Sequence, residues 1–427
     1  MGSVKNALLG SVFVACAAQA EAGMVDAKLL DMLLANGSIT KAQHTELSAD
    51  LAREARAESK KTRDLVAEKD FIAFRQLAGW AESTALRGDM RVRHEGIDIE
   101  GEPDFTKSRN KDRQRLRARL GAFTRINPEV ETGIQIASGN GADRRSTNEN
   151  LDNYFDKKAV WVDLAYINYN PVAVTGLKTF AGKMKQPWMS MGDVIWDGDI
   201  NPEGIAASYT KKNGTTTFFG SGGYYTMKDA VDGDGFEFEN DLSLYHLQGG
   251  AAFDAGDSVR LTLGASLYEF DNEEFGSTSS FRTNGNTTDR FGLYELFAQM
   301  DVIGLPLPLS VYGQYVRNHD ARDFGTALDG GEDTAFLIGL RTNVAGLAID
   351  YNYRDVEANA VVGGMTDSDF AAGYTNSSGH KIKVKYDILK NFAIGATYFM
   401  AESDVASSTG LTDADVDTLH IDLEAKF

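Results

Sequence analysis

From about residue 84 to its end, the chain alternates hydrophobic and polar residues with a period of two. The last segment shows the pattern best, because Leu419, Ile421 and Leu423 alternate with His420 and Asp422. Successive side chains of a β-strand point to opposite faces, so this segment predicts one apolar and one charged face. About sixteen such segments follow one another. They begin near Thr84, Asp112, Glu129, Ala159, Thr175, Gly204, Thr215, Asn240, Asp257, Arg290, Leu305, Glu332, Gly346, Ser378, Asn391 and Val416.

The connections between these segments alternate between short and long. Long polar loops are expected at residues 97–111, 138–158, 271–288 and 357–376. This alternation is typical of an up-and-down membrane barrel, in which tight turns connect the strands at the periplasmic end and long loops connect them at the outer end. The fold class predicted is an all-β membrane protein, a 16-stranded antiparallel up-and-down transmembrane β-barrel with a short N-terminal helical segment. The short turns are Asn127-Pro128, Asn170-Pro171, Asn213-Gly214, Ala255-Gly256, Gly304, Val344-Ala345 and Lys390-Asn391.

A membrane barrel explains the charged strand faces better than a soluble fold does. The alternative is a soluble β-sandwich or propeller. The charged residues on nearly every strand could not line the dry core of such a fold. In a closed barrel every backbone group is paired around the ring, so apolar faces can point to lipid and charged faces to a water-filled lumen. No repeat of propeller-blade length is visible.

The N-terminal 81 residues divide into an export signal and a helical segment. Residues 1–20 predict a signal peptide that is removed, with Lys5 before an apolar stretch and cleavage before Glu21. Cleavage after Ala22 and a lipoprotein signal ending at Cys16 are alternatives. Residues 21–81 predict a periplasmic helical or coiled-coil segment, and residues 82–427 the barrel.

Within that helical segment, local signals mark two helices. Asn36-Gly37-Ser38 should end the first, and Thr40 can cap the second. Leu47, Leu51 and Ala55 lie at i, i+4 spacing. They favour a coiled coil that sets an oligomer, most simply a trimer. A solvated single helix acting as a tether is the other interpretation.

Composition excludes several function classes. The formal charge is −19, which excludes a broadly basic nucleic-acid binder. Outside the first 20 residues no run of about 20 apolar residues occurs, so a polytopic helical membrane protein is not expected. The single cysteine, Cys16, permits no disulfide or Cys-based zinc site in the rest of the chain.

The six histidines are widely spaced, so no metal, cofactor or catalytic residue is predicted. The acidic stretch beginning Asp232-Gly-Asp-Gly resembles a calcium loop only loosely.

Eight stretches of the chain together match the pattern of one family. They are residues 29–33 (LLDML), 37–41 (GSITK), 91–95 (RVRHE), 112–120 (DRQRLRARL), 137–141 (ASGNG), 159–166 (AVWVDLAY), 181–187 (AGKMKQP) and 196–204 (WDGDINPEG). In these stretches the chain resembles the Gram-negative putative porins with an N-terminal helical extension. The resemblance implies a 16-stranded, trimeric diffusion channel in the outer-membrane lipid, but no particular solute. It also implies that the terminal Phe427 is an assembly signal read by the barrel-assembly machinery.

Six arginines are the first candidates for selectivity. Four fall at i, i+2 spacing on one predicted strand, so all four point to the lumen, and two more lie on the preceding strand. They are Arg113, Arg115, Arg117 and Arg119, with Arg91 and Arg93. They could form a cationic pore wall, or they could pair with lumen acids and only rigidify the barrel.

The predicted third outer loop, residues 184–203, is the candidate partner of this wall. It carries Asp193, Asp197 and Asp199, together with Trp188 and Trp196. By porin resemblance this loop folds inward and narrows the pore, and acids opposite arginines would create a transverse field. An ordinary outward loop is the alternative, and sugar stacking on the tryptophans is a minor one.

The sequence therefore predicts an outer-membrane porin that passes small hydrophilic, preferentially anionic, solutes. Loop charges in bulk water are screened beyond about 8 Å at physiological salt. Charges lining a narrow lumen act directly on the permeating ion. Position should thus outweigh the total charge of −19. The alternative is a non-transport barrel, such as an envelope tether or outer-membrane hydrolase.

Overall fold

The computed structural model describes residues 28–101, 108–231, 237–272, 283–303, 307–321, 332–405 and 411–427. The chain divides into two compact units, with the boundary between Glu82 and Ser83. The predicted signal peptide and the Asp232-Gly-Asp-Gly motif lie outside the described residues.

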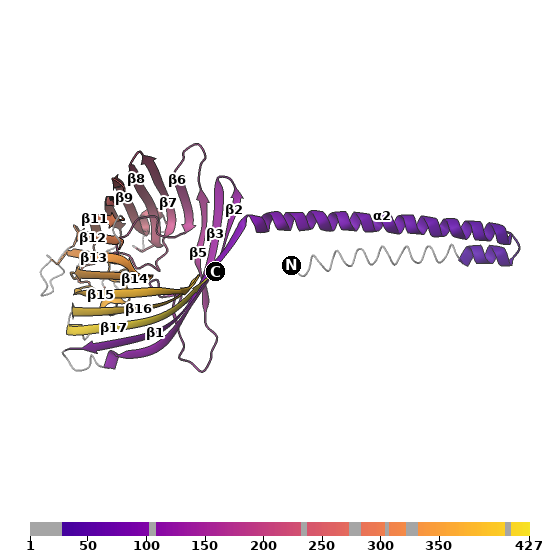
Figure 1. The fold of residues 1–427 in the computed structure, drawn as a ribbon. Helices are drawn as coiled ribbons and strands as arrows, with labels where there is room; N and C mark the ends of the chain where they lie inside the picture. The colour runs from indigo at the N-terminus through magenta and orange to yellow at the C-terminus, as the bar shows by residue number, and fades with distance from the viewer. Residues whose placement is uncertain are drawn as a thin grey trace. The chain divides into compact units, whose positions relative to one another are not determined.

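The first unit is a pair of helices. Residues 28–35 are helical, and α2 spans Lys41–Glu82 (Figure 1). Gly37 takes a positive φ of 79°, the left-handed conformation that commonly ends a helix. Thr40 and Gln43 form a reciprocal cap. The backbone N–H of Gln43 donates to Thr40 Oγ1 at 3.3 Å, and the backbone N–H of Thr40 donates to Gln43 Oε1 at 2.9 Å. The predicted stop and cap are confirmed. No helix in the described ranges is both long and apolar enough to cross a bilayer.

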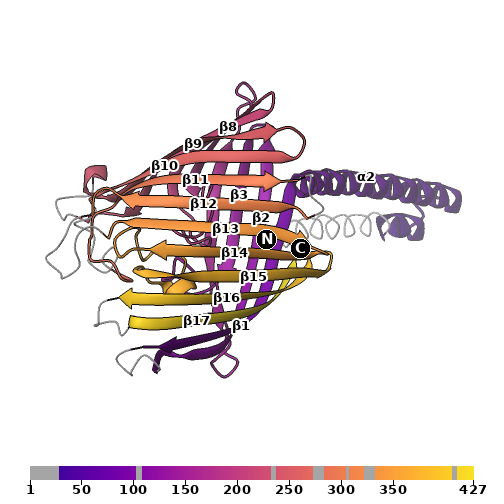
Figure 2. The ribbon, with the colours of Figure 1, turned by 60° about the vertical axis from the view of Figure 1, so that its left-hand side comes forward.

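The second unit is a closed antiparallel β-barrel. Its strands follow one another in chain order around the ring, and β1 pairs with both β2 and β17 (Figure 2). The strands are β1 (Thr84–Glu100), β2 (Lys111–Asn127), β3 (Val130–Ser138), β4 (Glu149–Asn150), β5 (Val160–Tyr169), β6 (Leu177–Lys183), β7 (Glu203–Asn213), β8 (Thr216–Lys228), β9 (Leu242–Ala255), β10 (Val259–Asp271), β11 (Gly292–Val302), β12 (Leu309–Asn318), β13 (Thr334–Val344), β14 (Leu347–Val356), β15 (Ser377–Leu389), β16 (Phe392–Val405) and β17 (Leu411–Lys426).

Sixteen of these strands form the barrel wall, as predicted. The other, β4, has two residues and pairs with β2 from the loop between β3 and β5. The predicted starts agree closely with the observed ones; the largest differences are at β12 and β17, which begin at Leu309 and Leu411. The predicted turn at Gly304 lies outside the described residues.

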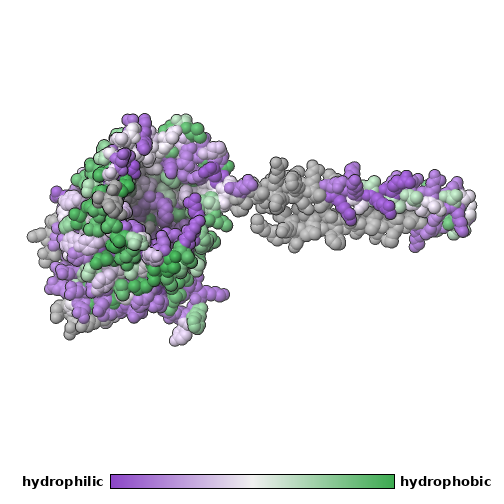
Figure 3. Space-filling model, in the orientation of Figure 1, coloured by the Kyte–Doolittle hydropathy of each residue, from purple (hydrophilic) through white to green (hydrophobic). Residues whose placement is uncertain are grey.

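The apolar side chains of the strands point outward and the charged ones inward. On β17 the side chains of Leu419 and Ile421 are both 38% exposed, whereas those of His420 and Asp422 are 1% and 9% exposed. This is the reverse of a soluble protein and suits a barrel with lipid outside and water within. Figure 3 shows the barrel hollowed, with apolar residues over its outer surface and hydrophilic residues at the hollow.

The chain end completes the ring. Phe427 exchanges two backbone hydrogen bonds with Gly88 of β1, at 2.9 and 3.0 Å. A Cβ atom at Gly88 would come within 2.5 Å of the Phe427 ring, so a glycine is needed beneath the aromatic. The Phe427 side chain is itself 62% exposed on the outer face.

Candidate channel constriction

The arginine ladder predicted from the sequence lies on the inner face of the barrel wall. On β2, Arg115 and Arg117 are buried while the alternating Leu120 is 46% exposed on the outside. Arg91 and Arg93 project inward from β1, and the strands are in register so that Arg91 lies opposite Arg117 and Arg93 opposite Arg115. The six arginines therefore come from two adjacent strands and line one side of the lumen.

Acids from β1 separate the arginines of β2 into pairs. Asp89 accepts hydrogen bonds from Arg117 Nε at 2.9 Å and Arg119 Nε at 2.8 Å. Glu95 accepts from Arg113 Nε at 2.6 Å and Arg115 Nη1 at 2.9 Å. Each carboxylate thus holds two guanidinium groups, which offsets the repulsion that a bare ladder would have.

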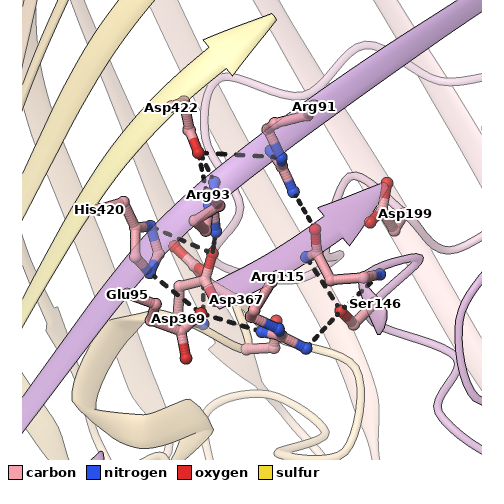
Figure 4. Close-up of polar contacts among 12 residues, drawn as sticks. Arg91, Arg93, Glu95, Arg115, Ser146, Asp199, Asp367, Asp369, His420 and Asp422 are labelled. Atoms are coloured by element: carbon pink, nitrogen blue, oxygen red, sulfur yellow. Dashed lines mark hydrogen bonds and ion pairs between the residues drawn. The ribbon is translucent and has the colours of Figure 1, made fainter. Parts of the chain in front are cut away.

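Strand β17 and the loop before β15 supply further acids (Figure 4). Asp422 accepts two hydrogen bonds from Arg93, at 2.8 and 3.0 Å, and Arg91 lies 3.9 Å from the same carboxylate. Asp369 lies 3.2 Å from Arg93 Nη1. In all, the six arginines contact six carboxylates, those of Asp89, Glu95, Asp199, Asp369, Asp422 and Glu424.

The loop between β6 and β7, residues 184–202, packs on inward-facing side chains of the opposite wall. Trp188 and Trp196 are 6% and 4% exposed, and their rings lie 5.2 Å apart. Trp188 also packs edge-on against Tyr225 of β8 and Tyr268 of β10. These aromatic contacts, and the burial of both indole rings, hold the loop in place. Little of either tryptophan ring remains exposed, so neither can stack on a sugar.

The three acids of this loop have different surroundings. Asp199 lies 3.4 Å from Arg119 Nη1 and accepts hydrogen bonds from the backbone and hydroxyl of Thr147. Asp193 faces Lys381 instead, at 3.7 Å. Asp197 accepts from the backbone N–H groups of Asp199 and Ser368. Of the three acids expected opposite the arginines, the structure brings only Asp199 to them.

The environment of Asp197 also reduces its charge. Burial, and then the nearby Asp367 carboxylate, raise the pKa of Asp197 to about 8. At neutral pH this carboxyl is therefore largely protonated and adds little negative charge to the lumen.

A second inserted loop was not foreseen from the sequence. The loop between β14 and β15, residues 357–376, contains fully buried Ala358, Ala360 and Val361. Arg145 donates to the carbonyl oxygens of Gly363 at 3.0 Å and of two further residues of this loop. The apolar residues 360–362 (AVV) were the available signal, because a loop exposed to water is usually polar.

The two inserted loops divide the lumen into an apolar half and a charged half. A cluster of buried apolar side chains joins both loops to the inner faces of β7–β14. The charged half is the wall from β15 through β17 and β1 to β2. A cavity of about 770 Å³ lies beside the first loop and is lined by Thr147, Trp188, Trp196 and Asp199, among others.

A lysine ladder on β15 was also missed. Lys381, Lys383 and Lys385 have the same i, i+2 spacing as the arginines of β2 and alternate with the outward Ile382 and Tyr386. Lys381 lies 3.4 Å from Asp367, and Lys385 donates to Glu424. The spacing alone could have revealed these inward cations.

Three side chains far apart in sequence come close enough to hold a metal. Ligand atoms of Glu95, Asp369 and His420 lie within 4.8 Å of one another. However, Arg93 and Arg115 already contact the two carboxylates, so a divalent cation would meet strong repulsion. The cluster is better explained as part of the ion-pair network.

Comparison with known proteins agrees with this geometry. A family described as "putative porin" matches residues 97–299 and 344–427, which is more than half of the chain. The chain belongs to this porin family. Among solved structures, OprB of Pseudomonas putida has a TM-score of 0.51 at 9% identity, over 81% of this chain and 95% of that one. OmpF of Salmonella typhi, in complex with daunomycin, has a TM-score of 0.48 at 13% identity, over 81% and 97%.

A short match links this porin to a further protein. A segment of 30 residues is 67% identical to "Phosphate starvation-inducible protein 1" of Pseudomonas fluorescens. The segment covers 7% of this chain and 77% of that protein. The family and the barrel together make the protein an outer-membrane porin, a channel through which small solutes cross.

Proposed function

We propose that this porin is a diffusion channel that prefers small anionic solutes. The observation that carries the proposal is the concentration of arginine and lysine side chains on the inner face of β1, β2 and β15. Permeating ions pass these groups at short range, where the effective dielectric is lower than in bulk water. The phosphate-starvation relative is consistent with an anionic solute.

In this proposal Arg91, Arg93, Arg113, Arg115, Arg117 and Arg119 form one wall of the constriction, and the loop of residues 184–202 forms the other. Asp199 supplies the acidic side of a transverse field through its contact with Arg119. Asp193 and Asp197 contribute less, because Asp193 faces Lys381 and Asp197 is turned to backbone N–H groups.

Planar-bilayer conductance in a potassium chloride gradient tests the proposal. Purified protein should give discrete channel steps, and the zero-current potential should have the sign of chloride permeation, modest in size because the wall is largely ion-paired. A strongly cation-selective channel would refute the anion preference. Absence of channel steps would instead favour a non-transport barrel.

We further propose that residues 1–20 direct export and are removed, and that residues 21–81 form a periplasmic coil that supports a homotrimer. In the described part of the helices, the side chains of Leu29, Met32 and Leu47 are 53%, 62% and 44% exposed. Apolar groups left uncovered in one chain support burial against a second copy. On the barrel, the neighbouring Tyr154 and Phe155 are also fully exposed, which supports an oligomer.

Deleting residues 24–70 is expected to lower the temperature at which the oligomer dissociates in detergent and to leave barrel folding unchanged. The reason is that the coil would add contacts between chains but none that the barrel needs to close. The gel mobility of samples heated to a series of temperatures, compared with unheated samples, reports both the dissociation of the oligomer and the folding of the barrel. An unchanged dissociation temperature would reduce the segment to a tether.

A further inference from the structure

The cations of the lumen fall into a compensated and an uncompensated group. Each of the six arginines has a carboxylate oxygen within 3.9 Å. A cation held this close to a buried acid acts on a distant ion as part of a dipole, whose field falls off faster than that of a single charge. The ladder therefore attracts a permeating anion less than its six charges suggest.

Lys383 belongs to the second group. It lies on the inner face of β15 between Lys381 and Lys385, which contact Asp367 and Glu424. The side chain of Lys383 makes no hydrogen bond or ion pair within the described residues, and it is exposed on the inner face. The charges that act on it are Lys381, Glu424, Lys385 and Asp193.

Lys185 is the corresponding group on the inserted loop. The side chain of Lys185 is exposed, and it makes no hydrogen bond or ion pair with any residue in the part of the chain that the structure covers. The charged groups around it are Asp163, Arg119, Asp199 and Arg117. A small anion beside the Lys185 amine would supply the opposite charge that no side chain places in contact with it.

We propose that Lys185 and Lys383 are the specificity-determining cations of this channel, each forming a transient site for a small inorganic anion, while the six arginines offset the charge of the lumen acids with which they pair. This inference rests on the proposed anion preference and assigns it to particular residues. The two lysines come from different elements, the inserted loop and β15, so a permeating anion would meet them as separate sites.

The test uses the full-length protein with Lys185→Gln and Lys383→Gln combined. Neither lysine leaves an unpaired acid behind when its charge is removed, so the barrel should fold normally. The anion-to-cation permeability ratio should fall at least threefold. The concentration of inorganic phosphate that half-blocks the chloride current should rise at least fivefold.

Two further variants make the result specific. The matched control is Lys211→Gln with Lys390→Gln. Both lysines are exposed, Lys390 lies in a turn, and Lys211 is on the outer face of β7 with Ile205 and Tyr209, so this control should change neither quantity. Lys185→Arg with Lys383→Arg keeps both charges and should retain the preference of the unmodified channel. If the unmodified channel prefers anions and the double Gln variant keeps both values, the assignment to these lysines is wrong. If the unmodified channel shows no anion preference, the proposed function itself fails.

Discussion

Replacing Arg115, Arg117 and Arg119 together by Gln is expected to move the channel toward cation preference. The exchange removes three positive charges and leaves Asp89 and Glu95 with fewer or no guanidinium partners. In a tenfold salt gradient a perfectly selective channel reaches about 59 mV, and we expect a shift of more than about 10 mV toward the cation value. The shift is measured by comparing the zero-current potential of the triple variant with that of the unmodified channel.

The same exchange should destabilise the barrel. Breaking a buried ion pair by removing one partner costs roughly 3–5 kcal/mol, because the remaining charge is left without compensation. The control is Arg125→Gln, Arg260→Gln and Arg317→Gln, three arginines that are at least 46% exposed and are each paired with one acid. This control should change neither selectivity nor stability much, since exposed pairs contribute about 0–1 kcal/mol. An unmoved potential in the triple lumen variant would leave the ladder a purely structural role.

Phe427→Asp is expected to reduce the amount of folded barrel in the outer membrane several-fold. The Phe427 backbone bonds to Gly88 would survive the change. A carboxylate near the edge of the lipid-facing band costs only about 0–1 kcal/mol. A large loss would therefore reflect failed recognition during assembly, the role that the porin resemblance implies, more than an unstable product.

Heat-modifiable mobility of outer-membrane fractions distinguishes folded from unfolded protein in this experiment. Phe427→Tyr keeps an aromatic ring at the chain end and should assemble normally. If Phe427→Asp reaches the same yield as the unmodified chain, Phe427 is not an assembly signal.

The sequence by itself determined the strands and the direction of their side chains. Residues such as Leu419 and Asp422 alternate along one strand, and the pleat of a strand sends alternate side chains to opposite faces whatever lies beside it. The same local rule placed Arg113, Arg115, Arg117 and Arg119 in the lumen. Helix caps such as Thr40 are equally local, because their partners lie three residues away.

Only the tertiary structure decided which charges compensate one another. Arg93 meets Asp422 and Asp369, and Arg119 meets Asp199, across separations of 80 to 329 residues. These contacts depend on ring closure between β1 and β17 and on two loops folding into the lumen. Loop insertion depends on apolar surfaces from many strands, so the loop sequence alone did not reveal that residues 357–376 turn inward. For the same reason Lys185 and Lys383 became distinct from the arginines only when every neighbouring acid had been placed.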